Sequence, residues 1–347
     1  MAARRSPASA AGHEPSAQRT VMKAIVQHRY GPPDVLALEE IGTPAVGDDD
    51  VLVRVHAAGL NAGDSFIMRG VPYVLRLVAG LRRPRHGVRG ADVAGTVAEV
   101  GANVTDLRPG DEVLGSCTDL VIGGAFAEYA RLPHDKVVPK PATVTFEQAA
   151  SVPVPAITAL QALRDQARLR PGQRVLINGA SGGVGTFAVQ IAKVLGAEVT
   201  GVCSTRNTGL VASIGADAVI DYTREDFTRG TCRFDVIVDN VANHPLSHCR
   251  RVLTPEGALV PKANTRGRRI GGYSRTIKAL VMARFVPQRI RPFLAAVNHE
   301  DLLTLAGLIE SGKITPVIDR TYPLSQVPDA IRYLEQGHAR GKIVITV

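Results

Sequence analysis

Hydrophobic and polar positions along the chain follow two different periods, and the change comes near Phe146. Before it, short runs alternate apolar with polar residues, most clearly DVLVRVHA, as half-buried β-strands do. Glycine and proline clusters separate these runs, which favours a small, partly open β-barrel. The predicted strands are Lys23–Gln27, Asp50–Ala57, Val93–Val100, Glu112–Leu114 and Ala127–Arg131.

Beyond Phe146, longer runs of helical period alternate with short apolar runs. This alternation indicates a parallel sheet covered by helices on both faces. The predicted order is helix Gln148–Asp165, interrupted by two prolines, strand Arg174–Asn178, helix Gly183–Leu195, strand Glu198–Cys203, helix Thr208–Ile214, and strands Ala218–Asp221 and Phe234–Asn240. A last helix, Asp329–Gln336, precedes the apolar strand Gly341–Val347, which we expect to return to the first domain.

Two domains are the natural expectation for 347 residues. We expect one domain at residues 22–155 and 298–347, and a second at 156–297. Residues 1–21 lack periodicity and are interpreted as a disordered extension, with a targeting segment or a start at Met22 as alternatives. Four widely spaced cysteines without a CxxC pair favour reduced thiols in a cytoplasmic protein.

The excess positive charge is concentrated in one stretch. The net charge is +9, and nine basic residues with no acidic one lie between Lys262 and Arg291. No zinc-finger spacing or RNA-binding signature accompanies them, so nucleic acid is not expected as a partner. An apolar run inside the stretch, Ala279–Ala283, predicts a helix packed on the nucleotide-binding domain or at a homodimer interface. Contact with an anionic membrane surface through residues 262–291 is the less favoured alternative.

The strongest motif is RVLINGASGGVGTFAVQIAK, at Arg174–Lys193. An apolar strand runs directly into a glycine-rich turn and then into an amphipathic helix, as in a Rossmann dinucleotide site. Free N–H groups at the start of the helix favour a diphosphate. The predicted cofactor contacts are Ala180, Ser181, Gly182, Gly183, Val184 and Gly185, with alanine at the first glycine position of the usual pattern.

The end of the next strand indicates which nicotinamide cofactor is used. An NAD site places an acidic residue there, where it binds the ribose 2′-hydroxyl. No acidic residue occurs from Val199 to Val211, and the strand ends instead in Ser204, Thr205 and Arg206. Two hydroxyls and a guanidinium suit a 2′-phosphate, and a charge-assisted hydrogen bond contributes roughly 1.5–3 kcal/mol. The prediction is NADPH, with an ordinary solvated loop as the alternative.

Several short motifs from Met22 onward together resemble one family. They are AAGLN at Ala57–Asn61 with Asp64, GADVAG at Gly90–Gly95, PGDEV at Pro109–Val113, GAFAEY at Gly124–Tyr129, ASGGVG at Ala180–Gly185, and Gly341–Lys342. The chain resembles the zinc-free quinone-oxidoreductase branch of the medium-chain dehydrogenases/reductases. The resemblance implies an α/β fold, in which a GroES-like catalytic domain, a partly open β-barrel, joins a Rossmann domain with a doubly wound parallel sheet.

The resemblance also implies site residues. Asn61 is expected beside the nicotinamide or the substrate, and Thr158 against the nicotinamide, so both are candidate catalytic residues. Tyr222 and Lys342 are expected on the adenosine-phosphate side or in the cleft. Alternatives stay open for three of them: Asn61 as a turn-satisfying amide, Thr158 as a helix residue that bonds its own backbone, and Tyr222 as a packing residue.

Three departures from the family pattern bear on the chemistry. Two zinc-ligand positions of zinc alcohol dehydrogenases hold Asn61 and Ala91, which cannot build a tetrahedral site, so no metal is expected. Phe66 stands where many quinone oxidoreductases have tyrosine, which removes a hydroxyl from the cleft. After the predicted strand Ala258–Val260, Pro261–Asn264 replaces the expected glycine-rich loop.

The predicted function is reduction of a small-molecule quinone or α,β-unsaturated carbonyl compound by NADPH without zinc. Without a metal Lewis acid an isolated carbonyl is hard to polarise, whereas a conjugated acceptor spreads the charge that hydride transfer leaves. No side chain identifies itself as the acid, so the proton can come from water; Tyr73 is the candidate side chain, with a packing role as its alternative. Two alternatives stay open: a zinc-free alcohol, ketone or enoyl-thioester reductase, and an NADPH-binding sensor or scaffold with little turnover.

Overall fold

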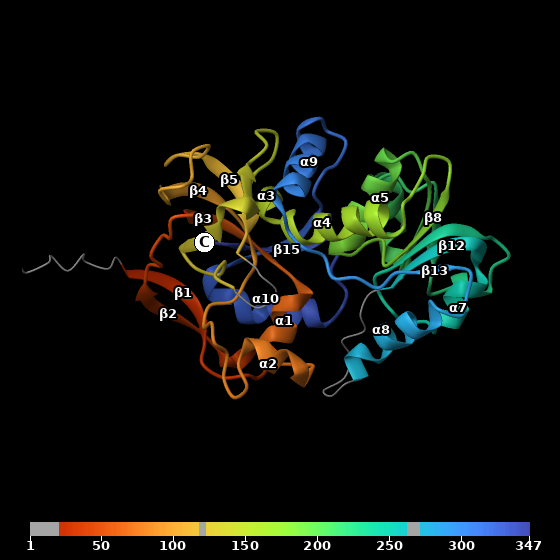
Figure 1. Ribbon diagram of the computed structural model, residues 1–347, viewed down its shortest axis with the longest axis horizontal. Helices are drawn as coiled ribbons and strands as arrows, with labels where there is room; N and C mark the ends of the chain where they lie inside the picture. Colours follow the sequence, from red (N-terminus) through yellow and green to blue (C-terminus); the bar gives the residue numbers. More distant parts are fainter. Residues whose placement is uncertain (1–20, 118–122, 262–270) are drawn as a thin grey trace, which may run out of the picture.

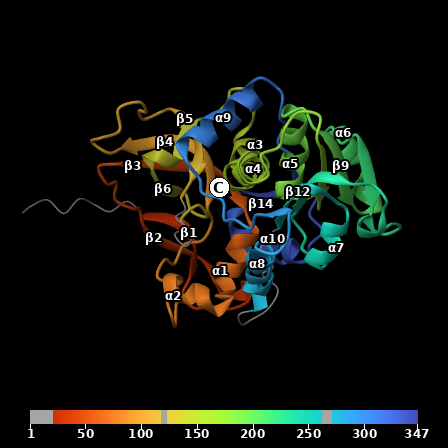
Figure 2. The same cartoon turned by 45° about the vertical axis from the view of Figure 1, so that its right-hand side comes forward.

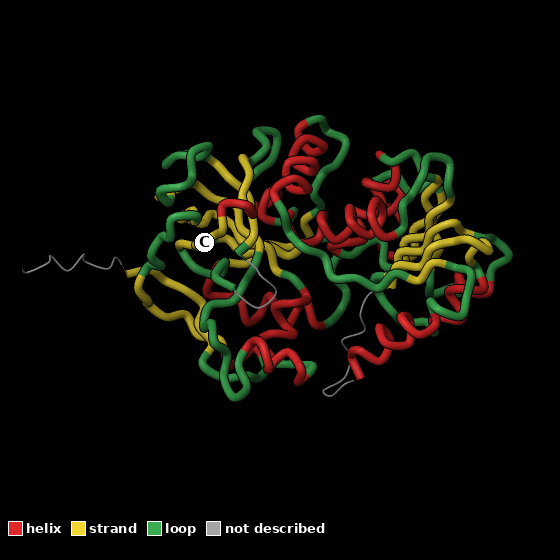
Figure 3. The backbone as a smooth tube through the Cα atoms, viewed as in Figure 1, coloured by secondary structure: helices red, strands yellow, loops and turns green. Residues whose placement is uncertain are grey.

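Two β-sheets surrounded by helices make up the molecule (Figure 1). The computed structural model describes residues 21–117, 123–261 and 271–347. One sheet has seven strands and the other six, and a separate two-stranded sheet pairs β1 (Val21–Gln27) with β2 (Leu36–Gly42). The tube in Figure 3 shows the two larger sheets in opposite halves of the molecule, with helices between them.

The seven-stranded sheet combines strands from the first and the last parts of the chain. Its order is β14-β15-β3-β4-β5-β7, and β6 pairs with β3 beside this path. The pairing of β14 with β15 is parallel and the others are antiparallel. The strands are β3 (Asp50–Leu60), β4 (Asp92–Val100), β5 (Glu112–Ser116), β6 (Tyr129–Pro133), β7 (Val137–Pro139), β14 (Ile318–Pro323) and β15 (Lys342–Thr346).

The last strand returns to the first sheet, as the sequence predicts. β15 runs antiparallel to β3, with Ile343 opposite Leu60. It lies inside the sheet between β14 and β3, which is why its residues from Lys342 to Ile345 are buried. This register brings Lys342 to the end of β3, directly before Asn61.

The six-stranded sheet is parallel throughout, with the order β10-β9-β8-β11-β12-β13. Numbered along the chain, this is the order 3-2-1-4-5-6 of a doubly wound dinucleotide-binding sheet. The predicted Rossmann-type sheet is therefore confirmed. Its strands are β8 (Arg174–Asn178), β9 (Glu198–Cys203), β10 (Ala218–Asp221), β11 (Phe234–Asp239), β12 (Leu253–Pro261) and β13 (Arg289–Ile290).

Helices cover both faces of the parallel sheet because successive side chains of each strand point to opposite faces. On β8, Val175 and Ile177 belong to the apolar cluster that contains α4 and α5, whereas Leu176 belongs to the cluster with α7 and α8 (Figures 1 and 2). The helices are α1 (Ala62–Arg69), α2 (Arg76–Ala79), α3 (Phe146–Ala150), α4 (Pro153–Gln161), α5 (Gly183–Val194), α6 (Thr208–Ser213), α7 (Leu246–Arg251), α8 (Gly271–Met282), α9 (His299–Glu310) and α10 (Val327–Glu335).

The helical segment predicted at Gln148–Asp165, interrupted by two prolines, forms three pieces. α3 ends at Ala150, α4 begins at Pro153, and a π-helical turn, Ala162–Gln166, follows. Proline is tolerated in the first turn of a helix, where its missing N–H costs nothing, so Pro153 and Pro155 start α4 rather than kinking a longer helix. Buried residues of α4 join one apolar cluster that includes side chains from both large sheets.

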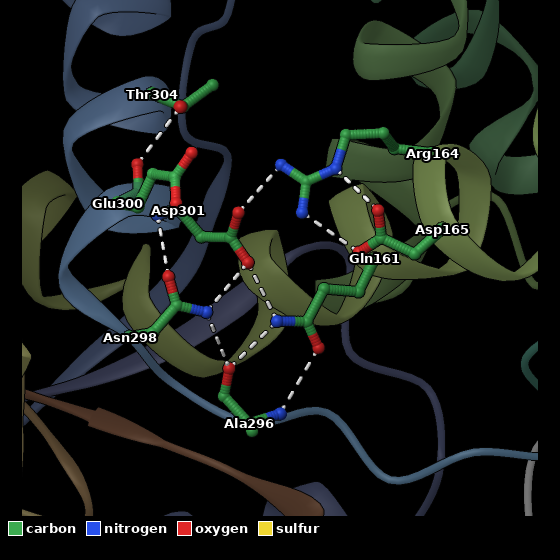
Figure 4. A network of polar contacts seen from close by, with 8 residues as sticks. All are labelled: Gln161, Arg164, Asp165, Ala296, Asn298, Glu300, Asp301 and Thr304. Atoms are coloured by element: carbon green, nitrogen blue, oxygen red, sulfur yellow. Dashed lines mark hydrogen bonds and ion pairs between the residues drawn. The ribbon is translucent and has the colours of Figure 1, made fainter.

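A network of polar side chains ties α4 and the π-helical turn to α9 (Figure 4). The buried carboxylate of Asp301 accepts hydrogen bonds from Arg164 Nη1 (2.7 Å), Gln161 Nε2 (2.7 Å) and Asn298 Nδ2 (2.9 Å). Burial works against its charge, but these donors hold the pKa of Asp301 below its ordinary value. We call this set the Asp301 network.

No helix in the described part of the chain is long and apolar enough to cross a bilayer.

Candidate cofactor and active site

The glycine-rich turn between β8 and α5 lets the start of the helix lie close to the turn. Gly179 has a φ of +79°, and α5 begins at Gly183. A Cβ atom on Gly185 would lie 2.0 Å from the carbonyl oxygen of Gly179, so only glycine lets the helix come this near the turn. The first N–H groups of an α-helix have no helical partner, and they bind a diphosphate in sites of this shape. The individual contacts of Ala180–Gly185 with a cofactor stay a prediction.

The C-terminal segment is joined to this turn. Gly341 donates its N–H to the carbonyl oxygen of Ser181 at 2.8 Å. The side chain of Lys342 passes beside Gly183, where an added Cβ would lie 2.8 Å from Lys342 Cδ. Lys342 therefore reaches from the predicted diphosphate turn to the end of β3.

The three residues predicted to bind the 2′-phosphate follow β9 at the protein surface. Thr205 Oγ1 donates to the Asp221 carboxylate at 2.6 Å, and this hydrogen bond holds the pKa of Asp221 below its ordinary value. The exposed Arg206 donates from Nη2 to the carbonyl oxygen of His338 at 2.6 Å. Ser204 caps the short 3-10 turn that follows, Thr205–Asn207, without a hydrogen bond from its side chain.

Sequence reasoning missed a second arginine at this end of the site. Arg340 donates from Nη2 to the carbonyl oxygen of Arg206 at 3.1 Å, although the two residues are 134 positions apart. The only signal in the sequence is that Arg340 directly precedes the Gly341–Lys342 motif. Two guanidinium groups therefore lie near the end of β9. Tyr222, in contrast, is 52% exposed, and its backbone N–H bonds to Cys203.

Asn61, Lys342 and Asp92 form a connected set at the end of β3. Lys342 Nζ donates to Asn61 Oδ1 at 2.8 Å and to the carbonyl oxygen of Leu60 at 2.7 Å. Asn61 Nδ2 donates to Asp92 Oδ2 at 2.8 Å. The amide of Asn61 is thus fixed in one orientation, because its oxygen must face the ammonium and its nitrogen the carboxylate. We call this set the Asp92 network.

Burial shifts the pKa of each ionisable group in and beside the Asp92 network toward its neutral form. Burial raises the pKa of Asp92 to about 7, against the opposing effects of Lys342 and Asn61. Burial also raises the pKa of Asp64, which accepts a hydrogen bond from the Asn61 N–H, to about 6. The pKa of the buried Lys342 is lowered by the same desolvation. Groups that titrate this near neutrality in a buried cluster mark a candidate functional site.

Thr158 bonds to the backbone of its own helix, which was the alternative interpretation of this residue. Its hydroxyl donates to the carbonyl oxygen of Val154, one turn earlier in α4, at 2.7 Å. The N–H of Val154 in turn donates to Asp92 Oδ1 at 3.2 Å. The structure therefore links both candidate catalytic residues to Asp92, Asn61 directly and Thr158 through the backbone of Val154. Contact of either with a nicotinamide stays a prediction.

Zinc does not fit the residues of this site. The amide of Asn61 is already bonded on both sides, and Ala91 has no donor atom. Burial, with Asp92 and Asp64 adding to it, raises the pKa of Cys117 to about 12, which disfavours a thiolate ligand. Within residues 21–117, 123–261 and 271–347, no group of three or more His, Cys, Asp or Glu side chains could hold a metal ion.

Comparison with known proteins places the chain in a family. Residues 47–142 match the family model described as "Alcohol dehydrogenase GroES-like domain", and residues 214–345 match the one described as "Zinc-binding dehydrogenase". The mouse protein named NAD(P)H oxidoreductase RTN4IP1, mitochondrial, is 36% identical over 364 residues, which cover 96% of this chain and 91% of that protein. This chain belongs to the quinone-oxidoreductase branch of the medium-chain dehydrogenases/reductases.

Two further members of the family are similar over most of their length. The Arabidopsis thaliana protein named NADPH-dependent alkenal/one oxidoreductase, chloroplastic, is 35% identical, covering 93% of this chain and 79% of that protein. The structure of the quinone oxidoreductase from Coxiella burnetii is 34% identical with a TM-score of 0.82, covering 94% of this chain and all of that one. The predicted fold and family are confirmed, and the chain is an oxidoreductase. Of the predicted departures, Phe66 lies in α1, while Lys262–Asn264 fall outside the described residues.

Proposed function

We propose that this protein reduces quinones or α,β-unsaturated carbonyl compounds with NADPH, without a catalytic zinc ion. The observation that carries the proposal is the Asp92 network, which fixes an amide where zinc enzymes of the wider family need a metal ligand. The names of the relatives support the substrate class, because one is an alkenal/one oxidoreductase and another a quinone oxidoreductase.

The nucleotide end of the site favours NADPH over NADH. The turn Ala180–Gly185 would hold the diphosphate, and Arg206 with Arg340 would bind the 2′-phosphate. Thr205 would contribute less than the sequence predicts, because its hydroxyl proton is already given to Asp221. When bound, NADPH supplies the hydride for the reaction.

Asn61 is proposed to orient the acceptor. With its oxygen bonded to Lys342 and one N–H bonded to Asp92, the second N–H of the amide is the group left to donate to an acceptor oxygen. One neutral N–H stabilises a localised alkoxide poorly, but it suffices to position a conjugated acceptor whose charge is delocalised. Thr158, bonded to Val154, would act through packing and through its remaining oxygen lone pairs.

The decisive experiment compares a cyclic enone with the matched saturated ketone while NADPH oxidation is followed. We expect rapid consumption with the enone and hardly any with the ketone. Equal rates would contradict the mechanism. If no quinone or enone led to NADPH consumption, an NADPH-binding sensor would be favoured over an enzyme. Metal analysis of the active protein tests the zinc claim, since about one bound zinc per chain would refute it.

Three finer points are part of the proposal. The domain division places residues 22–155 and 298–347 together, in keeping with the strands that build the seven-stranded sheet. A homodimer is the second point, and sedimentation of the purified chain tests it. The cytoplasmic location is tested by fractionation, and it contrasts with the mitochondrial and chloroplastic names of the relatives.

A further inference from the structure

Helix α8 carries apolar residues on its outer face as well as on its inner one. Ala279 is fully buried against the parallel sheet. On the other side, Ile277, Leu280 and Val281 are 51%, 55% and 55% exposed, and Phe285, just after the helix, is 80% exposed. Large apolar side chains that gather on an exposed surface mark a site of interaction. The outer face of α8 is therefore an uncovered apolar surface.

This helix is firmly held in place. Arg275, on its inner side, donates to the buried carboxylate of Asp239 and to the carbonyl oxygen of His244. Asp239 also accepts from Asn178 Nδ2 at 2.8 Å, at the carboxyl end of β8. Because α8 is bonded to the parallel sheet, its outer side chains form a fixed surface.

A second segment, after α1, has the same character. The 3-10 turn Tyr73–Leu75, α2 and the residue that follows Gly80 expose large apolar side chains to solvent. They are Tyr73 (46%), Val74 (46%), Leu77 (64%), Val78 (54%) and Leu81 (67%).

The two segments lie along the same edge of the molecule. In both Figure 1 and Figure 2, α2 and α8 are at the lower edge with α1 between them, whereas α9 is at the upper edge. Helix α1 begins directly after Asn61. The apolar edge is thus next to the candidate active site.

Both segments are free of acidic residues. The sequence has no Asp or Glu between Ser65 and Ala91, and none between Gly257 and His299. Exposed basic residues accompany the apolar ones, and in the described part of the chain none of them forms an ion pair. They are Arg82, Arg83, Arg85, Lys278, Arg284 and Arg291.

We infer that this edge docks on an anionic lipid bilayer, and that the site takes lipophilic acceptors from it; the second part rests on the proposed function. Apolar side chains interleaved with arginine and lysine are the chemistry of a surface that lies in the membrane interface. A second copy fits less well, because a symmetric contact of this edge with itself would bring the basic residues together. Nucleic acid fits less well because it offers little apolar surface for the exposed leucines and Phe285 to contact.

Flotation of the full chain with vesicles tests the docking. We expect binding to phosphatidylcholine vesicles that contain phosphatidylserine, and little binding to phosphatidylcholine alone. Leu77→Asp and Leu280→Asp should each weaken binding about tenfold or more. Arg82→Gln should weaken it about five-fold. Matched controls are Leu303→Asp on α9, a leucine 47% exposed at the upper edge, and Arg224→Gln, whose side chain is 77% exposed beyond β10; both should bind as the unaltered protein does.

Activity separates the two inferences. NADPH oxidation with a water-soluble quinone should be unchanged in Leu77→Asp and Leu280→Asp, while oxidation by a long-chain quinone embedded in the anionic vesicles should fall in step with vesicle binding.

Three results would overturn the docking: equal binding to both vesicle types, an equal loss of binding in Leu303→Asp, or no binding at all. A smaller native mass of Leu280→Asp would overturn the docking in favour of contact with a second copy of the chain. RNA binding by the unaltered protein that is lost in Arg82→Gln would overturn it in favour of nucleic acid. No turnover with any acceptor would remove the proposed function and leave vesicle binding as its own result.

Discussion

Asp92 and Asp301 are both buried carboxylates that join segments far apart in the chain, yet their surroundings differ. Asp301 accepts from a guanidinium and two side-chain amides, and its pKa lies below the ordinary value. Asp92 accepts from one side-chain amide and one backbone N–H, and its pKa is raised to about 7. The cation nearest the Asn61 amide, Lys342, bonds to that amide and not to Asp92.

The difference teaches how charge is used in this fold. At the Asp301 network the donors fully match the carboxylate, so the network holds α9 against α4 and the π-helical turn. At the Asp92 network the charges are incompletely matched, which costs stability and leaves groups that titrate near neutrality. Four experiments would break or sharpen this comparison.

The largest effect is expected at Asn61. Asn61→Ala removes the amide between Lys342 and Asp92, and with it the proposed donor to the acceptor. A misplaced acceptor can cost about a hundredfold in rate, so kcat should fall on the order of a hundredfold. NADPH affinity, measured by fluorescence titration, should stay within a few-fold. An unchanged kcat would remove Asn61 from the chemistry.

Asp301→Ala should act on stability instead. It removes the buried acceptor that the Arg164 guanidinium and the Gln161 amide share, at a cost of roughly 1.5–3 kcal/mol in the free energy of unfolding. Urea denaturation gives the value, and turnover below the transition should be retained. Asp165→Ala is the matched control, because Asp165 binds the same arginine at the surface, where about 1 kcal/mol or less is expected. Equal losses of unfolding free energy in the two variants would show that the burial of Asp301 adds nothing to stability.

The two carboxylates should give opposite dependences of stability on pH. Asp92 has an ordinary pKa of 3.8 and a folded value of about 7, so the folded state binds the extra proton between these values. Its contribution is present at low pH and is lost as the pH rises toward 7. Asp301, with its pKa lowered, contributes above its ordinary pKa and loses that contribution as the pH falls.

Unfolding free energies measured from about pH 2 to 8 therefore check the signs. Asp92→Asn should flatten the decline between pH 4 and 7, and Asp301→Asn should remove part of the loss on the acid side. The reverse pattern would mean that the Asp92 carboxylate is better matched than its contacts indicate.

The smallest effect is expected where charge is exposed. Arg206→Ala should weaken NADPH binding about tenfold, or about 1.4 kcal/mol, with little change for NADH. Arg340→Ala should act in the same direction, and Arg229→Ala, with a side chain 86% exposed and paired with Asp226, is the control. Raising the salt concentration should reduce the difference, in contrast to both buried networks. Equal affinity for NADPH and NADH in the unaltered protein would refute the cofactor assignment at Arg206.

The strand–turn–helix of β8 and α5 could be predicted almost to the residue, because hydrophobic period and glycine spacing are local signals. The return of β15 was also predictable from its apolar run. The Asp92 network was not, because Lys342 and Asn61 are 281 positions apart and only the register of β15 on β3 brings them together.

One signal for that network was nevertheless in the sequence. Asp92 comes directly before the apolar residues Val93–Gly95 of β4, and an acidic residue there has to be buried with partners. Arg340 could not be placed, because a single exposed arginine before a glycine indicates nothing about its neighbours. Thr158 was predicted at the correct helix, but whether its hydroxyl faces a ligand or the carbonyl of Val154 depends on a side-chain rotation that no pattern encodes.

The position of β15 has a consequence for biosynthesis. The strands of the parallel sheet are complete once residue 290 has been made, so that sheet can form while translation continues. Lys342, which carries the link between the diphosphate turn and Asn61, is held by a strand that ends at Thr346. That strand can be inserted between β14 and β3 only after its residues have left the ribosome. The link between the diphosphate turn and Asn61 is therefore made after the strands of the parallel sheet are available, which makes it a late step of folding.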